Sequence, residues 1–228
     1  MQVSSRELTP ESGDFAALLQ NYHIGIYGPT GSGKSVLVED FWKAAPGVAI
    51  CFNADEDPLP GAQCGTVRDV ARLMAQGHRR IVLDPGPTQD LVRVSGELRD
   101  LTFRMGELYK GDERKAPFIG NVFWTEAHLY APKHDKDGPL PDFFRRARKR
   151  GWRGVVDSQS PSDVSHPVVK QAKLRALFGF DEIEMEYFRG YAIPIEEFQE
   201  HTAQPHHWVL CNGGKWHAYY PVPLEETA

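Results

Sequence analysis

The chain has 228 residues, 41% of them apolar and 25% charged, which is the composition of a folded globular protein and a length that favours one domain. Its 26 Lys and Arg against 31 Asp and Glu give a net charge of −5, which excludes a protein that coats nucleic acid with its whole surface and leaves a local basic patch open. Three cysteines, an odd number, exclude a disulfide framework and indicate a reducing compartment. No apolar run approaches the roughly 18 residues of a membrane span.

Apolar and β-branched runs alternate with helical patterns along the chain, which predicts an α/β fold with a mostly parallel sheet and crossover helices. The expected strands are His23–Tyr27, Val48–Asn53, Arg80–Asp84, Phe118–Thr125, Gly154–Ser158 and Leu177–Phe180. The expected helices are Lys34–Lys43, Val67–Gln76, Thr88–Leu108, Asp142–Arg150 and Pro167–Leu174. Exposed loops are expected at Asp55–Gly65 and Ala131–Pro141.

The C-terminal region predicts a β-hairpin. The runs Trp208–Cys211 and Lys215–Tyr220 flank Asn212-Gly213-Gly214, a turn rich in Asn and Gly. We expect this hairpin at an edge of the main sheet or on its surface.

The segment Gly28 to Ser35, Gly-Pro-Thr-Gly-Ser-Gly-Lys-Ser, matches the phosphate-binding loop pattern completely, between an expected strand and an expected helix. Its glycines let backbone N–H groups surround phosphate oxygens, Lys34 can reach the β- and γ-phosphates, and the Ser35 hydroxyl can coordinate Mg²⁺. ATP and Mg²⁺ are therefore the expected ligands. The expected nucleotide-binding residues are Gly28, Pro29, Thr30, Gly31, Ser32, Gly33, Lys34, Ser35 and Val36.

A second strand, Phe118–Thr125, leads into Glu126-Ala127-His128. Glu126 is expected to act as the general base that orients water toward the γ-phosphate. Thr125 stands where an acid would hold the metal, so we expect it to contact Mg²⁺ through a water and to supply no charge. If Glu126 only ends the strand, the next candidate bases are Asp84 and Asp157, at the ends of neighbouring strands.

A third motif combines the basic segment Arg145–Arg153, a strand, and the turn Ser158-Gln159-Ser160-Pro161. The run Ala147–Pro161 resembles the stretch in FtsK/HerA-type DNA-pumping ATPases in which an Arg-containing helix end leads into a strand and a Thr/Ser-Gln-x-Pro turn. The phosphate loop and the Glu126-Ala127-His128 ending look like the same family's first two motifs. The resemblance covers roughly residues 22–195.

The resemblance implies a RecA-like P-loop fold, with a central, mostly parallel sheet flanked by helices. It implies that Gln159 is the polar sensor of the γ-phosphate or the catalytic water, and that Arg148 is presented to a neighbouring subunit's nucleotide. In size, the chain looks most like genome-packaging ATPases of tailless viruses with an internal membrane. We expect residues 1–21 to form an N-terminal extension and residues 22–228 the ATPase domain, hairpin included.

The expected function is an ATP-hydrolysing motor that translocates double-stranded DNA and packages a viral genome into a preformed capsid. The expected assembly is a homo-oligomeric ring, a hexamer or pentamer, in the host cytoplasm or at the virion vertex, with a capsid-vertex or membrane protein as a further partner. The alternatives are a filamentous-phage-type assembly ATPase, and a P-loop nucleotide switch or small-molecule kinase with Asp142–Arg153 as its basic lid. The basic segment is equally compatible with a solvated helix face and with a subunit interface or DNA pore.

Overall fold

The computed structural model describes residues 12–53, 59–180, 184–185, 195–212 and 215–219. The strands are β1 (Ile24–Tyr27), β2 (Val48–Phe52), β3 (Ala62–Cys64), β4 (Arg80–Leu83), β5 (Gly120–Trp124), β6 (Trp152–Ser158), β7 (Leu174–Leu177), β8 (Trp208–Asn212) and β9 (Lys215–Tyr219). The helices are α1 (Ser12–Asn21), α2 (Lys34–Ala44), α3 (Val67–Ala75), α4 (Leu91–Lys110), α5 (Pro139–Arg146), α6 (His166–Gln171) and α8 (Ile195–Thr202), with short 3₁₀ helices η1 (Ala127–Leu129) and η2 (Ala147–Arg150).

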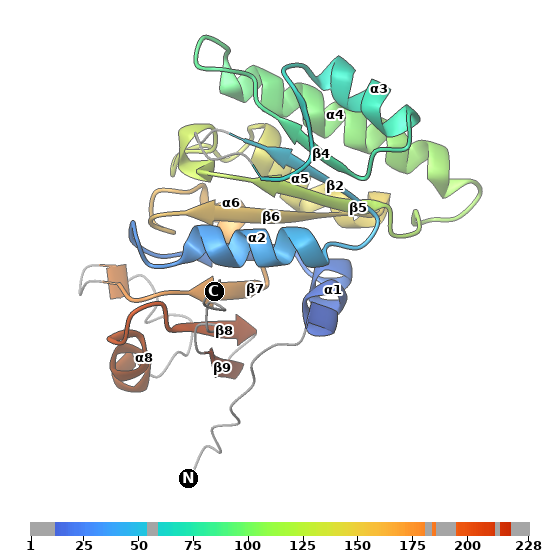
Figure 1. Cartoon of the computed structure of the whole chain (residues 1–228). Helices are drawn as coiled ribbons and strands as arrows, with labels where there is room; N and C mark the ends of the chain where they lie inside the picture. Colours follow the sequence, from blue (N-terminus) through green and yellow to red (C-terminus); the bar gives the residue numbers. More distant parts are fainter. Residues whose placement is uncertain (1–11, 54–58, 181–183, 186–194, 213–214, 220–228) are drawn as a thin grey trace, which may run out of the picture.

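The described strands form one nine-stranded sheet in the order β3-β4-β2-β5-β6-β1-β7-β8-β9 (Figure 1). The pairs from β3 to β7 are parallel, whereas β7–β8 and β8–β9 are antiparallel. The predicted α/β fold with a mostly parallel sheet is confirmed, and so is a C-terminal antiparallel pair of strands at the sheet edge. β1 lies between β6 and β7. The residues that follow β1 can therefore contact the residues that follow either neighbouring strand.

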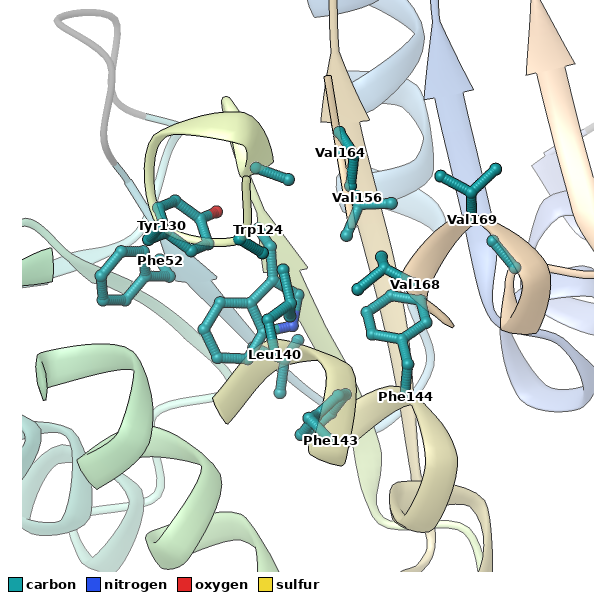
Figure 2. Packing of buried hydrophobic residues seen from close by; sticks show 14 of the residues in the cluster. Phe52, Trp124, Tyr130, Leu140, Phe143, Phe144, Val156, Val164, Val168 and Val169 are labelled. Atoms are coloured by element: carbon teal, nitrogen blue, oxygen red, sulfur yellow. The ribbon is translucent and has the colours of Figure 1, made fainter. Parts of the chain in front are cut away.

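Helices cover both faces of the sheet, so the central strands β1, β5 and β6 are buried along their whole length. On one face α2 packs against β1, and α1 packs against α2, β5 and β6; Phe41 and Trp42 of α2 are fully buried, and α2 crosses in front of the sheet in Figure 1. On the other face, Phe143 of α5 packs edge-to-face against Trp124 of β5, and Phe144 packs beside Phe143, near Val168 of α6 (Figure 2). This second layer also takes in side chains of α3, α4, α6 and α8.

Several helices begin where the sequence supplies a cap. The Thr66 side chain accepts a hydrogen bond from the backbone of Asp69 at the start of α3, and Asp90 does the same for Arg93 at the start of α4. Pro139 occupies the first turn of α5, where a missing N–H costs nothing. These local signals explain why the three helices start within a few residues of their predicted positions.

Some element boundaries were predicted wrongly. The strand after α6 is Leu174–Leu177 rather than Leu177–Phe180, so the predicted helix Pro167–Leu174 ends early, at Gln171. The predicted helix over Asp142–Arg150 is divided into α5 and η2. In each case the pattern of apolar residues continues across the boundary, and the pairing of β7 with β1 decides where the strand begins.

Other elements had not been predicted. Residues 62–64 lie in an expected loop but form the short edge strand β3, whose side chains are only partly buried. The helix α1 is tied to the sheet because Asn121 donates to the carbonyl of Leu19 at 2.9 Å. The boundary expected at residue 22 falls between α1 and β1, and it stays a prediction. The hairpin's Gly213, Gly214 and Tyr220 lie outside the described residues. None of the described helices meets the length and hydropathy of a membrane span.

Candidate nucleotide site

The phosphate loop follows β1 at the carboxyl edge of the sheet and leads directly into α2. Gly31 and Gly33 have φ angles of 77° and 102°, in the left-handed region that a β-carbon disfavours. Gly33 is the last residue before α2, so its conformation turns the chain into the helix. The loop therefore presents backbone N–H groups and the positive end of α2 to the same space, which suits a phosphate group.

Gly28 is required for a different reason, which is close packing. A β-carbon on Gly28 would lie 2.5 Å from Cβ of Phe178, the residue that follows β7. Phe178 is itself fixed, because its backbone N–H donates to the carbonyl of Tyr27 at 2.9 Å. The loop thus rests directly on the end of the β7 strand.

Lys34 is only 7% exposed although it is the first residue of α2. Its Nζ donates a 3.0 Å hydrogen bond to the carbonyl of Pro29, so the side chain reaches back across the loop. This geometry places the ammonium charge where a phosphate-binding loop holds the β- and γ-phosphates. The next two residues, Ser35 and Val36, are exposed, and the hydroxyl of Ser35 is accessible to a cation.

Glu126 lies in the turn after β5, and β6 separates this strand from β1. Its φ of 48° is left-handed, which is unusual for a residue with a side chain and is often found at functional sites. The backbone N–H of Glu126 donates a 2.9 Å hydrogen bond to Oδ1 of Asp157, near the end of β6. The turn is therefore anchored to the strand that lies beside β1.

His128 links the same two strands. Its Nδ1 lies 3.2 Å from Oε2 of Glu126 and 3.3 Å from Oγ of Ser158, the last residue of β6. The Glu126 side chain is 20% exposed, so water can reach the carboxylate while the histidine limits its movement. Such a group can orient a water molecule and accept its proton.

Thr125, which precedes Glu126, is held by the core. Its hydroxyl donates to the carbonyl of Phe52 at 3.3 Å, and its own carbonyl accepts a 2.7 Å hydrogen bond from the hydroxyl of Tyr130. The Tyr130 ring packs against Phe52 and Trp124 in the aromatic cluster of Figure 2. Burial and the nearby Asp157 carboxylate raise the pKa of Tyr130 well above its usual range, so this phenol stays a hydrogen-bond donor.

The oxygen atoms that can coordinate a metal ion at the carboxyl ends of these strands fit a hard cation such as Mg²⁺. They comprise the hydroxyls of Ser35 and Thr125 and the carboxylates of Glu126 and Asp157. Oε2 of Glu126 is buried, and it lies 3.2 Å from Nδ1 of His128. The expected assignment, Ser35 as a ligand and Thr125 as a contact through water, stays a prediction.

The two remaining predicted residues, Gln159 and Arg148, lie at opposite ends of the strand β6. Gln159 is exposed directly after β6, at the same edge as Lys34 and Glu126. Arg148 lies in η2, before β6, and the seven residues of that strand span about 20 Å. The structure thus brings Lys34, Ser35, Glu126 and Gln159 to one edge, and Arg148 cannot reach the phosphate loop of its own chain.

The five cations of the basic segment between residues 145 and 150 divide into two groups. Arg145, Arg146 and Arg150 each form an ion pair with a carboxylate of the same chain. Arg148 and Lys149 are exposed, and in the part of the chain that the structure describes neither forms an ion pair. These two cations are therefore available to a partner.

Of the two alternative bases, Asp157 is the one that the geometry retains. It lies on the strand next to β1 and touches the backbone of Glu126. Asp84 follows β4, four strands from β1 and so about 19 Å away across the sheet, which is too far to orient a water at the phosphate loop. The contacts of Asp157 and His128 with Glu126 could not be predicted from the sequence, because neither contact follows from a motif.

The fold matches solved structures over almost its full length. The genome packaging NTPase of Sulfolobus turreted icosahedral virus 2, in complex with AMP, is 16% identical and superposes with a TM-score of 0.68, covering 89% of this chain and 98% of that one. The DNA-packaging ATPase of Sulfolobus turreted icosahedral virus is 16% identical, with a TM-score of 0.63 and coverages of 90% and 99%.

The cytoplasmic domain of the type VII secretion ATPase EccC from Thermomonospora curvata is 18% identical, with a TM-score of 0.55 over 90% of this chain and 26% of that one. No protein-family model and no curated protein sequence matches the chain. At identities this low, the structural likeness establishes the fold alone. The chemistry has to be argued from the residues of the site. The chain has the fold of these packaging ATPases, and this likeness agrees with the FtsK/HerA-type resemblance of its three motifs.

Proposed function

We propose that this chain is a Mg²⁺-dependent ATPase that acts as a motor on double-stranded DNA and packages a viral genome into a preformed capsid. The observation that carries the proposal is the arrangement of Lys34, Glu126 and Gln159 at one edge of the sheet, beside a complete phosphate loop. The likeness to two viral packaging enzymes over nearly the whole of both chains supports the same function.

The chemistry follows from the roles that these side chains can take. Lys34 and the loop N–H groups hold the β- and γ-phosphates and stabilise the negative charge that develops on them. A water oxygen attacks the γ-phosphorus, its proton passes to Glu126, and ADP leaves with the bridging oxygen. Gln159, exposed directly after β6, would hydrogen-bond the γ-phosphate or this water. Bound Mg²⁺ would neutralise charge on the phosphates, held by Ser35 and, through water, by Thr125.

The position of Arg148 is the reason why we propose an oligomer. It is exposed at the edge opposite its own phosphate loop, so it can stabilise a γ-phosphate only when that phosphate belongs to another subunit. A contact between two different faces repeats head to tail, and it closes into a ring when the rotation allows. We propose a ring of five or six subunits, with the remaining exposed cations facing the DNA backbone.

We also propose how the chain is divided and where the ring works. Residues 22–228 form the ATPase domain and residues 1–21 its N-terminal extension. The ring works in the host cytoplasm and docks on the capsid vertex or on a membrane protein there, and the chain itself needs no membrane span for this role.

Displacement of a third DNA strand tests the proposal directly. A triplex-forming oligonucleotide is annealed near one end of a linear duplex, and its release is followed with the full chain and Mg²⁺-ATP. We expect release by the wild-type protein and none by Lys34→Ala; Lys43→Ala, an exposed lysine of the same helix that pairs with Glu39, is the matched control. ATP hydrolysis that is indifferent to DNA, with no release of the third strand, would favour the switch or kinase alternative.

A further inference from the structure

Glu184 lies in the segment that follows β7, and its side chain reaches the turn that carries Gln159. Oε1 of Glu184 accepts a hydrogen bond from the hydroxyl of Ser160 at 2.7 Å and another from the hydroxyl of Ser162 at 3.3 Å. Glu184 and Ser160 are 24 positions apart in the chain. Glu184 belongs to none of the three motifs, so this contact is a separate feature of the site.

The two serines form a compact turn of their own. The backbone N–H of Ser162 donates to Oγ of Ser160 at 3.0 Å, and the two hydroxyl oxygens lie 2.8 Å apart. Ser160 is 8% exposed, and Pro161 beside it is also buried. Because the Ser160 hydroxyl both accepts from this turn and donates to Glu184, the carboxylate fixes the chain immediately after Gln159.

Gln159 is therefore held from both sides while its own side chain is exposed. On the preceding side, Oγ of Ser158 lies 3.3 Å from Nδ1 of His128, which also contacts the proposed base. On the following side, Ser160 is hydrogen-bonded to Glu184. Fixing the backbone on both sides limits the positions that the amide of Gln159 can take, and a reaction that depends on positioning gains from this.

Glu184 is itself anchored to the core. Met185, the next residue, is 3% exposed and is part of the same hydrophobic cluster as Val156 of β6 and Val209 of β8. A carboxylate beside a buried apolar residue has little freedom to move, so Glu184 gives the turn a fixed support. Hydrogen bonds to a carboxylate are also stronger than those between neutral groups.

We propose that Glu184 is a positioning residue for ATP hydrolysis, which holds the turn at residues 160–162 so that Gln159 contacts the γ-phosphate or the attacking water. The inference rests on the proposed ATPase function and adds to it a residue that no motif supplies. In this role Glu184 does not touch the nucleotide and acts only through Gln159. Its loss should therefore lower kcat and leave KM for ATP nearly unchanged, because Lys34 and the phosphate loop bind ATP without it.

The experiment is a double-mutant cycle on ATP hydrolysis by the full chain with double-stranded DNA present, using Glu184→Ala and Gln159→Ala alone and combined. Glu184→Gln is the conservative variant, since its amide oxygen can still accept from both serines. Ser160→Ala removes the same hydrogen bond from the other partner, and it replaces Glu184→Ala in the cycle if that variant does not fold. Glu197→Ala is the matched control, because Glu197 is an exposed glutamate of α8. Steady-state kinetics give kcat and KM, and thermal melting checks folding.

We expect Glu184→Ala and Ser160→Ala each to lower kcat about tenfold, as for the loss of one hydrogen bond to a carboxylate, and to change KM for ATP less than about twofold. In the Gln159→Ala background, Glu184→Ala should lower kcat less than about twofold, because the residue through which it acts is already gone. Glu184→Gln should keep most of the wild-type rate, and Glu197→Ala all of it.

A tenfold loss of kcat that is the same with and without Gln159 would overturn the proposal, because Glu184 would then act elsewhere or only support the fold. Unchanged kcat in both Glu184→Ala and Ser160→Ala would overturn it as well. Failure of the proposed function looks different, because the wild-type protein itself would then hydrolyse no ATP, and the inference would fall with it.

Discussion

The backbone N–H of Glu126 donates to Oδ1 of Asp157 at 2.9 Å, so a carboxylate from one strand positions the proposed base on the next. This hydrogen bond supports the left-handed conformation of Glu126, which costs free energy elsewhere in a protein. A carboxylate acceptor makes the bond stronger than a neutral one would be. Asp157 is therefore a positioning residue, and its loss should disturb the geometry of catalysis more than the binding of ATP.

Asp157→Ala should lower kcat about tenfold to a hundredfold, which corresponds to a charged hydrogen bond of about 1.5–3 kcal/mol, and should leave KM for ATP nearly unchanged. Asp157→Asn should lose less, because an amide oxygen still accepts from Glu126. Steady-state kinetics on both variants check this, with thermal melting to confirm that they fold. If Asp157→Asn were as inactive as Asp157→Ala, Asp157 itself would be the stronger candidate for the base.

Glu126→Gln should bind ATP as the wild-type protein does and hydrolyse it about 10²–10⁴ times more slowly, because the amide keeps the shape and cannot accept a proton. Equilibrium binding and single-turnover hydrolysis separate the two effects. Glu97→Gln, at an exposed glutamate that pairs with Arg93, is the control and should behave as wild type. Normal hydrolysis by Glu126→Gln would remove Glu126 from the mechanism.

Arg148→Ala should lower turnover by a factor of about 10³ while ATP binding is kept, as for arginines supplied to a neighbour's γ-phosphate. Lys149→Ala is the matched control, because Lys149 is the adjacent exposed cation. Mixing Arg148→Ala with Lys34→Ala should recover part of the activity, since some interfaces then pair an intact phosphate loop with an intact arginine. No recovery on mixing, with specific activity constant down to monomer concentrations, would contradict the ring.

The pH dependence of stability should report the burial of His23. Burial, followed by the positive charges of Arg153 and Arg148, lowers the pKa of His23 to about 3, and Gly154 donates its N–H to Nδ1 at 2.7 Å. Below pH 6.5 His23 binds a proton in the unfolded chain, whereas in the folded chain it stays neutral down to about pH 3. The contribution of neutral, buried His23 to the free energy of unfolding is therefore complete above pH 6.5. It decreases as the pH falls from 6.5 toward 3.

His23→Asn should make the free energy of unfolding less dependent on pH between 6.5 and 5, by about 1.4 kcal/mol per pH unit at most. The asparagine oxygen can still accept from Gly154, so the variant should fold. Denaturant titrations at several pH values measure the slope for both proteins. Parallel slopes would show that His23 does not carry this difference in proton binding.

The phosphate loop could be predicted from the sequence because its requirements are local. Gly31 and Gly33 adopt left-handed angles that the motif anticipates, and Lys34 begins the helix as expected. Glu126 was predictable for a similar reason, since a buried strand ending in a carboxylate places that group at the edge of the sheet. Both predictions use only residues that are adjacent in the chain.

The contacts around the site could not be predicted in this way. Asp157 contacts Glu126 although the two residues are 31 positions apart in the chain. Their contact depends on the register of β5 and β6. His206 meets Ser32 across 174 positions, and the antiparallel pairing of β8 with β7 carries it there. The segment 202–207, which connects α8 to β8, is polar and has no apolar period, so no local pattern marked it as a neighbour of the phosphate loop.

The most direct test of the account is the release of phosphate from ATP by three purified, folded proteins: wild type, Lys34→Ala and Lys43→Ala. Removing Lys34 takes away the cation that faces the β- and γ-phosphates, whereas Lys43 is an exposed lysine at the far end of the same helix. We expect Mg²⁺-dependent hydrolysis that double-stranded DNA stimulates in the wild type and in Lys43→Ala, and no measurable hydrolysis in Lys34→Ala. Unchanged hydrolysis in a folded Lys34→Ala protein, or none in the wild type with DNA present, would contradict it.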